Sequence, residues 1–367
     1  FNCMRLKQLI KTLEQWALLS LQADYDNSGL AVGDPEMELS GAVVALDVTE
    51  SVIDQAIESG ANLVLTHHPI VFKPLRNLSG SDLVQRCLRK AIKHDIALYS
   101  LHTNLDSIPG GVSHEMAARM QVTDLQILQK RSGELFQLSV MVPNASMSKV
   151  MEALFAAGAG RIGHYQDCAF VTDGEGCFMP TQGANPHVGE VGKRHVDKEQ
   201  KVEVMVSAGD RSRVMAAMKD AHPFETISHQ WLALDQTHPE VGYGVVGTLS
   251  ESMTPEAFIN HVKQCFGLKV IRHSAFATDR IQTVAMCGGS GSDLLPLAIQ
   301  ANADVYITGD VSYHRFFEPD GNICMMDIGH WESEQYTKDL IMRKVQAEFP
   351  NFAVLQSDQP TNPVLIS

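Results

Sequence analysis

Two adjacent histidines, His67 and His68, stand where an apolar segment ends and a proline follows. Residues 62–66 have the short, apolar, β-branched character of a buried strand, and Pro69 cannot extend a strand because it has no N–H to donate. Neutral imidazole binds divalent metals near pH 7. Neighbouring side chains on a strand point to opposite faces, so both rings reach one site only if the backbone turns or if two metals are present. The alternative is a polar turn in which the histidines cap backbone groups.

A second group of polar residues follows the next predicted strand, residues 96–101. Asp106 is the better ligand candidate, because a carboxylate can bridge two cations and offset their charge. Asn104 can orient it from behind, and His102 can be either a ligand or a core residue. Ligands collect outside the carboxyl ends of parallel strands, which is where His67, His68 and Asp47 also lie. Two successive strand ends of this kind favour the metal interpretation.

The same arrangement recurs near the other end of the chain, where His330 and Glu334 follow the apolar run 323–329. On a helix these two residues stand at i and i+4 and face the same way, a spacing that suits one metal ion. Glu332 points elsewhere. We therefore expect the two ends of the chain to meet at a shared metal cluster.

The order of predicted elements indicates an α/β fold with three parts. The first part, residues 4–130, contains an amphipathic helix over 6–21, strands over 41–48, 62–66 and 96–101, and helices over 49–59 and 81–94, which form parallel βαβ units. Residues 240–367 resume a similar α/β pattern with strands at 243–249, 281–287, 305–310 and 323–329. The two α/β lobes are expected to form one main body.

The segment between the lobes, residues 131–239, has a different pattern. It reads as a strand over 136–142, a helix over 147–157, two short strands separated by residues 173–176, a strand over 202–207, a helix over 211–221 and a strand over 227–234. Two βαβ-type halves of this size predict an inserted ferredoxin-like (α+β) domain.

Composition excludes several classes of function. The formal net charge of −14 argues against a nucleic-acid or anionic-membrane binder, which needs excess Lys and Arg. The seven cysteines are widely spread and never form CxxC, which fits buried thiols in a reducing compartment. No apolar run approaches the roughly 20 residues of a membrane span. We expect a cytoplasmic protein without a membrane segment.

Two further motifs remain open from the residues alone. The turn Gly288–Gly291 follows a strand and can present N–H groups to an anion, or can be a simple tight turn; no Lys follows it, so it is not a P-loop. The pair His222 and Glu225 can mark a second site or an ordinary helix-to-strand turn.

Six motifs taken together resemble the Nif-three-like family: YDNSGLAVG at 25–33, THHPIVFKPL at 66–75, HTNLD at 102–106, GGSG at 288–291, TGDVSYH at 308–314 and DIGHWESE at 327–334. The inserted segment, with GAGRIGHYQDCAF at 158–170 and HPFET at 222–226, resembles the PII- or CutA-like domain of the family's long members.

The resemblance implies a dinuclear metal centre between two α/β lobes, with ligands carried here by His67, His68, Asp106, His330 and Glu334. It also implies a homo-oligomer, a hexameric ring whose metal sites face an internal cavity. Many family members carry the label GTP cyclohydrolase I type 2 homologue, for which the reaction is poorly established.

The first hypothesis is a metal-dependent hydrolase with two divalent ions, of which Zn, Fe or Mn suit the ligands, acting on a nucleotide or another phosphoester-type small molecule. Asp310, His314, His102 or Asn104 are candidates for the proton carrier. The alternative is a non-catalytic metal-binding regulatory or interaction protein in which the insert senses a small ligand.

Overall fold

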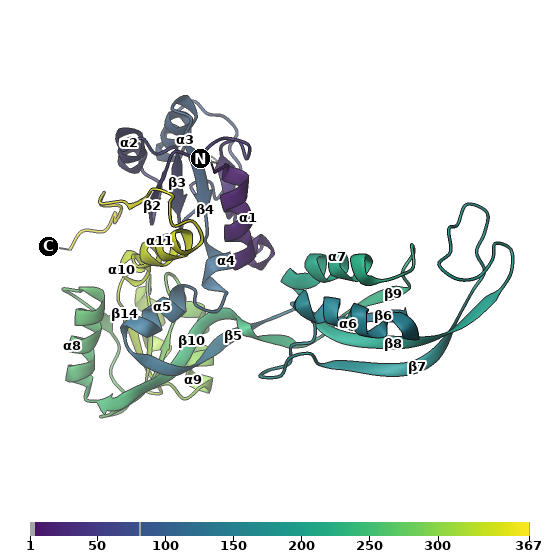
Figure 1. Cartoon of the computed structure of the whole chain (residues 1–367). Coiled ribbons are helices and arrows are strands. Elements are labelled where there is room, and N and C mark those ends of the chain that lie inside the picture. Colours follow the sequence, from purple (N-terminus) through teal and green to yellow (C-terminus); the bar gives the residue numbers. More distant parts are fainter. Residues whose placement is uncertain (1–3, 81, 367) are drawn as a thin grey trace. The chain divides into compact units, whose positions relative to one another are not determined.

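The computed structural model describes residues 4–80 and 82–366, and the chain divides into two compact units (Figure 1). The main body comprises Phe1–Gln129 and Glu240–Ser367, and the insert comprises Lys130–Pro239. The main body holds two sheets and the insert holds a third.

The first sheet of the main body has the order β1-β4-β3-β2-β15. Its strands are β1 (Gly29–Val32), β2 (Ala42–Ala45), β3 (Leu63–Thr66), β4 (Ala97–Ser100) and β15 (Val354–Gln356); all neighbours are parallel except β1 and β4. One face packs against α1 (Leu6–Trp16) and α11 (Thr337–Glu348), and the other against α2 (Glu50–Glu58) and α3 (Leu83–Lys93). Burial on both faces explains why these strands are continuous apolar runs. The helix predicted over 81–94 is α3, and position 81 lies outside the described residues.

The second sheet has the order β11-β14-β13-β12-β10-β5. Its strands are β5 (Val122–Ser132), β10 (Thr237–Met253), β11 (Arg272–His273), β12 (Ile281–Met286), β13 (Val305–Thr308) and β14 (Cys324–Asp327). Strands β12, β13 and β14 are parallel to one another, whereas β10 and β11 run antiparallel to their partners. The helices α5 (Val112–Arg119) and α8 (Pro255–Phe266) pack against one face, and α9 (Leu295–Gln300) packs against the other.

The two sheets do not follow the sequence boundaries 4–130 and 240–367. Helix α5 and strand β5 precede the insert in the chain, yet they complete the second sheet and its core. Helix α11 and strand β15 come last, yet β15 pairs with β2 and α11 packs beneath the first sheet. The segment before the insert therefore contributes a helix and a strand to the second sheet, and the segment after it contributes a helix and a strand to the first sheet.

The insert has the element order β6 (Leu135–Pro143), α6 (Met147–Ala156), β7 (Ala169–Phe178), β8 (His195–Ser207), α7 (Arg211–Ala221) and β9 (His229–Ala233). Its antiparallel sheet has the order β7-β8-β6-β9, and both helices pack on the same core of valines and leucines. This βαββαβ order confirms the predicted ferredoxin-like fold.

Strand β7 and the turn at His222 settle two points of the insert's structure. Strand β7 is continuous through residues 173–176, where two short strands were predicted; it is an exposed edge strand, where glycine and charged residues are tolerated. His222 donates from Nε2 to the carbonyl of Met141 at 2.9 Å and accepts the Phe224 N–H, which makes this segment a helix-to-strand turn.

The remaining elements are single turns: η1 (Leu19–Leu21), α4 (Thr103–Asp106), η2 (Asn144–Ser146), η3 (Ala208–Asp210), η4 (Ser292–Leu294), η5 (Tyr313–Phe317) and α10 (His330–Glu334). None of the helices in the described part of the chain is long and apolar enough to cross a membrane.

Candidate metal centre

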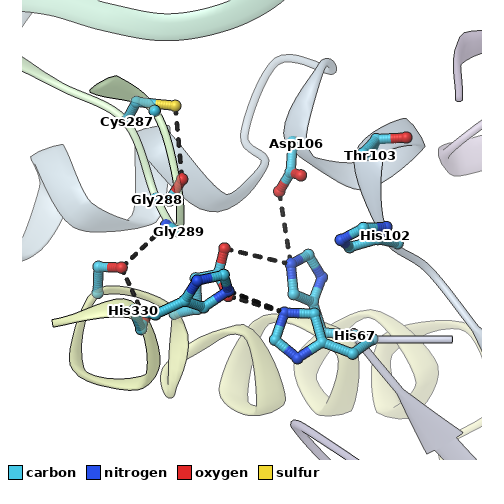
Figure 2. Close-up of polar contacts among 12 residues, drawn as sticks. His67, His102, Thr103, Asp106, Cys287, Gly288, Gly289 and His330 are labelled. Atoms are coloured by element: carbon cyan, nitrogen blue, oxygen red, sulfur yellow. Dashed lines mark hydrogen bonds and ion pairs between the residues drawn. The ribbon is translucent and has the colours of Figure 1, made fainter. Parts of the chain in front are cut away.

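The carboxyl ends of strands from both sheets meet at one cluster of ligand-type side chains (Figure 2). His67 and His68 follow β3 directly, and Asp106 ends the short helix α4 that follows β4. His330 and Glu334 are the first and last residues of α10, which follows β14. The structure therefore brings together all five residues predicted as metal ligands.

The ligand atoms form two groups of three that share one carboxylate. In the first group, Nε2 of His67 lies 3.6 Å from Oδ1 of Asp106 and 3.7 Å from Oε1 of Glu334. In the second group, Nε2 of His68 lies 3.0 Å from Oε2 of Glu334 and 3.3 Å from Nε2 of His330, which is itself 3.1 Å from that oxygen. Ligands around a tetrahedral zinc are about 3.3 Å apart when the bonds are about 2.0 Å long. The second group matches that spacing, and in the first group Nε2 of His67 lies near both carboxylates. A ring nitrogen of His102 also lies within 4.8 Å of those of His67 and His68.

Two buried atoms of the first group lack a hydrogen-bond partner. These are Nε2 of His67 and Oδ1 of Asp106, both inaccessible to solvent. A buried polar atom without a partner is costly, and one cation between these atoms would satisfy both. The residues present thus fit a bound metal, and the cluster can hold one.

Each ligand histidine donates its other ring nitrogen to a fixed acceptor. The Nδ1 atoms of His67, His68 and His330 donate to the Leu101 carbonyl at 2.8 Å, to Oδ1 of Asp47 at 2.7 Å and to Oδ2 of Asp310 at 2.7 Å, respectively. A carbonyl and a carboxylate can only accept, so the proton is on Nδ1 and the Nε2 lone pair faces the cluster in the neutral ring. Such partners orient ligand histidines in metal sites.

The electrostatics of the metal-free cluster favour protons where a metal would bind. Burial acts to lower the pKa of His68, but Asp47 and Glu334 outweigh it and raise that pKa to about 10. His330 behaves in the same way, with burial opposed by Glu334 and Asp310 and its pKa raised to about 9. Burial lowers the pKa of His67.

The two carboxylates of the cluster are driven in opposite directions. Burial and the negative charge of Glu334 raise the pKa of Asp106 well above its ordinary value. Burial would also raise the pKa of Glu334, but the neighbouring His67 and His330 hold it well below its ordinary value. Glu334 is therefore the charged centre of the cluster when no metal is present, and Asp106 holds its proton more tightly than an ordinary carboxyl.

His102, left open as ligand or core residue, lies at the cluster. Its ring centroid is 5.2 Å from that of His67 and 5.4 Å from that of His68. Its Nδ1 donates to Oδ1 of the buried Asp26 at 2.8 Å. Burial would raise the pKa of Asp26, but hydrogen bonds from His102 and Thr103 outweigh it and hold that pKa well below its usual range. An ionised Asp26 keeps the proton of His102 on Nδ1 and leaves Nε2 free.

The other three candidates for a proton carrier have different positions. Asp310 orients His330, as described above. Asn104 is fully buried, donates to the Ala17 carbonyl and accepts the backbone N–H of His102, so its contacts are structural. His314 packs against the ring of Tyr313 and is not part of the cavity wall.

The glycine turn holds helix α10 against the second sheet. The N–H of Gly289 donates to Oγ of Ser333 in α10, and the N–H of Gly291 donates to Oγ1 of Thr308, each at 2.9 Å. A Cβ at Gly289 would overlap Oε1 of Glu334. These two N–H groups are occupied by the protein itself, so the geometry favours the tight-turn alternative over an anion site.

Sequence reasoning did not find the role of the carboxylates behind the histidines. Asp47 was placed near a strand end and Asp26 lay in a turn motif, but neither was assigned to a histidine. For Asp47 and Asp310 the available signal was an aspartate close to the carboxyl end of a strand, whereas Asp26 precedes β1 and has no such signal.

The cluster lies at a cavity of about 1180 Å³ within the main body. His68, His102, Asp106, His330 and Glu334 contribute to its wall, as do Cys287 and the rim residues Tyr25 and Phe72. Burial raises the pKa of the Cys287 thiol to about 12, so this cysteine is a neutral wall residue.

Comparison with known proteins agrees with this geometry. The family model described as Duf34/NIF3 (NGG1p interacting factor 3) matches residues 4–363. A protein of Halalkalibacterium halodurans named GTP cyclohydrolase 1 type 2 homolog is 40% identical over 307 residues, covering 83% of this chain and 82% of that protein. The Bacillus subtilis protein of the same name is 35% identical over 341 residues, covering 92% and 91%.

Solved structures give the same result. A Bacillus cereus protein related to NIF3 superimposes with a TM-score of 0.88 at 31% identity, with 100% of both chains covered. A Staphylococcus aureus protein gives a TM-score of 0.77 at 28% identity, again with 100% of both chains covered. The family resemblance of the sequence motifs is thus confirmed over nearly the whole chain, and this chain belongs to the Duf34/NIF3 family.

Proposed function

We propose that this protein is a dinuclear metal-dependent hydrolase of phosphoester-type substrates. The observation that supports it is the position of Glu334, whose two carboxylate oxygens each face a different group of ligands. The proposed ligands are His67, Asp106 and Glu334 for one ion, and His68, His330 and Glu334 for the other. A set of nitrogen and oxygen ligands without a thiolate suits Zn, Fe or Mn.

When bound, a pair of divalent ions supplies Lewis-acid activation of water and of the scissile phosphoryl group. The protein's own residues fix the ligands and move the proton. Asp47 and Asp310 hold the rings of His68 and His330, so that Nε2 of each points into the cluster. The helix that carries Glu334 is tied to the glycine turn by the hydrogen bond from the Gly289 N–H to Oγ of Ser333.

His102 is the proposed proton carrier. Its Nε2 faces the cluster, and its Nδ1 is held by the ionised Asp26, which stabilises the ring when Nε2 accepts a proton. This is the logic of a histidine–aspartate pair in acid–base catalysis. The substrate proposal includes nucleotides, because the curated relatives carry a GTP cyclohydrolase name. We also propose a homo-hexamer, on family membership alone.

Metal counting tests the first half of the proposal. Elemental analysis of purified wild-type protein should give about two ions per chain, and His68→Ala and Glu334→Ala should both give fewer. Since Glu334 serves both groups, its loss should cost more metal than loss of His68. A wild-type chain without stoichiometric metal would overturn the proposal.

Turnover of a panel of phosphoesters tests the second half. His102→Gln should keep its metal and lose activity by roughly 10²–10⁴-fold, the usual contribution of a general acid or base. His314→Gln, which alters an imidazole away from the cavity, is the matched control and should retain full activity. Saturable ligand binding with no product from any substrate would instead support the regulatory alternative.

A further inference from the structure

We propose that the cavity selects a substrate with one phosphoryl group and an uncharged, mostly apolar body, such as a phosphomonoester of an aromatic or aliphatic alcohol, and discriminates against nucleoside triphosphates. This inference rests on the proposed function, because it places the phosphoryl group at the metal cluster. It concerns the walls of the cavity, which the metal ligands do not determine.

The described residues of the wall offer little positive charge. They include seven carboxylates, a single arginine and no lysine. Four of the carboxylates, Asp47, Asp106, Asp310 and Glu334, belong to the metal cluster or orient its histidines. Two divalent ions would balance those four negative charges. The metal-loaded cluster would then bind one phosphoryl group by direct contact with the ions but would have no net positive charge to attract further phosphates.

The single arginine already holds a buried carboxylate. Arg272 pairs with the buried carboxylate of Asp327 and donates to the Val311 carbonyl at 3.0 Å. Its guanidinium also lies 5.6 Å from the centre of the Phe316 ring. Releasing it toward a phosphate would leave Asp327 buried without its partner, which is unfavourable.

The other cations near the cavity are directed elsewhere. Arg315 pairs with the wall residue Asp293 and with Glu318. Lys338 lies over the Trp331 ring at 5.7 Å and does not form part of the wall. A triphosphate carries about four negative charges and is normally held by several Lys, Arg or backbone N–H groups. Two N–H groups of the glycine turn are already occupied, as shown above.

Apolar side chains, by contrast, line the approach to the cluster. Tyr25 is 74% exposed and Phe72 is 48% exposed, and both form part of the wall. The rings of Phe72 and His102 are nearly perpendicular with their centroids 5.4 Å apart, which places an aromatic side chain beside the proposed proton carrier. Ile70, Val270 and Val364 extend this apolar surface.

Exposed aromatic side chains in a cavity gain free energy when an apolar ligand covers them. The combination of a phosphoryl-binding floor with apolar walls therefore fits an amphipathic phosphomonoester. The same walls give no counter-charge to the two remaining phosphates of a nucleoside triphosphate once one of its three phosphoryl groups occupies the cluster.

Binding of non-hydrolysable probes tests this assignment without any turnover. Phenylphosphonate, methylphosphonate and the β,γ-imido analogue of GTP are titrated calorimetrically into the full-length, metal-loaded protein. Phenylphosphonate should bind roughly tenfold or more tightly than methylphosphonate, because a phenyl ring is buried on the walls, and more tightly than the GTP analogue.

Tyr25→Ala should remove a large part of the preference for phenylphosphonate and leave methylphosphonate unaffected. The matched control is Tyr313→Ala, because Tyr313 is similarly exposed at 71% and lies outside the cavity wall. This control should bind all three probes as the wild type does.

The outcomes separate this inference from the proposed function. Tighter binding of the GTP analogue, or equal binding of the two phosphonates, would overturn the inference while a hydrolase could still stand. The predicted preference without turnover of any substrate would support the inference and remove the hydrolase. Absence of binding by every probe to metal-loaded protein would overturn both.

Discussion

At the residue scale, the carboxylates behind the histidines decide how firmly the cluster can hold a metal. Asp310 accepts the Nδ1 proton of His330 while adopting a left-handed backbone conformation, with φ at +53°. Non-glycine residues seldom adopt this conformation, and Asn and Asp tolerate it best. Asp310 is thus positioned at a conformational cost, which fits a residue selected for what its side chain orients.

Asp310→Asn should weaken metal binding by about 10–100-fold, the usual effect of losing the partner of a ligand histidine. Asparagine keeps the size and the backbone tolerance of aspartate but removes the charge that favours Nδ1–H. The measurement is competition with a chromophoric chelator. Asp293→Asn is the control, since Asp293 also lines the cavity but pairs with Arg315. An equal loss in both variants would show that general cavity charge, not histidine orientation, determines affinity.

The raised pKa values of His68 and His330 predict a pH-dependent metal affinity. At pH 7 both rings carry an extra proton in the metal-free chain, since their pKa values are about 10 and 9. Metal binding must displace these protons, so affinity should rise with pH through the neutral range. Calorimetry at pH 7 in two buffers of different ionisation enthalpy should show net proton release, and buffer-independent heats would contradict it.

The same shifts predict the stability of the metal-free chain. Because both pKa values are raised above that of an unfolded histidine, the added proton stabilises the folded state fully below about pH 6.5. That contribution is lost as the pH rises through about 9 and 10, the folded-state pKa values. Denaturant unfolding of chelator-treated protein should therefore show lower stability at pH 10 than at pH 7.

The sequence alone predicts the metal ligands but not the carboxylates that orient them. His67, His68, His330 and Glu334 are predictable because pairs of ligand-type residues follow apolar strands at telling spacings. The bonds from Asp47 to His68 and from Asp26 to His102 join residues 21 and 76 positions apart. No local pattern specifies such pairs, because they depend on how the strands are aligned in the sheet.

At the element scale, short turns after the strands set the geometry of the cluster. Most regular elements were predictable from periodicity and caps; for example, Thr49 caps α2 and Thr254 caps α8 through their side chains. Helix α5 and strand β5 were not predicted. Strand β5 alternates exposed and half-buried residues at a sheet edge, so it lacks the apolar run that marked the central strands.

Gly289→Ala tests whether the turn between β12 and η4 positions α10. Gly289 has φ at +62°, and an added Cβ would overlap the carboxylate of Glu334. We expect a loss of metal greater than the change in folding stability would explain, measured by elemental analysis and thermal unfolding. Gly321→Ala is a matched control: its φ is +74°, but nothing lies within 4 Å of the added Cβ. It should show only the backbone cost of a left-handed alanine, roughly 1–2 kcal/mol, and full metal content.

Comparable metal loss in the two glycine variants would mean that backbone strain, rather than contact with Glu334, causes the effect. Full metal content in Gly289→Ala would show that α10 can shift without disturbing the cluster. Either result would show that contact with the glycine turn does not position Glu334.

At the scale of the whole molecule, the main body contains every ligand and every cavity residue discussed above, and the insert contains none of them. The insert also has its own apolar core beneath its sheet. The change in the pattern of predicted elements after residue 130 made this division predictable. The exchange of α11 and β15 into the first sheet was not, because pairing between residues near 43 and near 355 is a purely tertiary feature.

The connection to the insert is made by two adjacent strands of the second sheet, β5 and β10. Gly242 lies against Gln129 and Gly247 lies against Thr123, so these strands run antiparallel and the two crossing points are neighbours. A chain in which residues 130–239 are replaced by a short Asn-Gly hairpin turn can therefore close without stretching either strand. This shortened chain should fold, because the core clusters on both faces of the main body's two sheets keep their buried residues.

The shortened chain should bind the same number of metal ions as the full chain, with an affinity within a few-fold, by elemental analysis and chelator competition. The control is the isolated insert, residues 130–239, which should bind no metal at the same concentrations. Loss of metal from a shortened chain that still unfolds cooperatively would show that the insert supports the cluster. Retention of metal with altered substrate turnover would assign the insert a role in regulation rather than in metal binding.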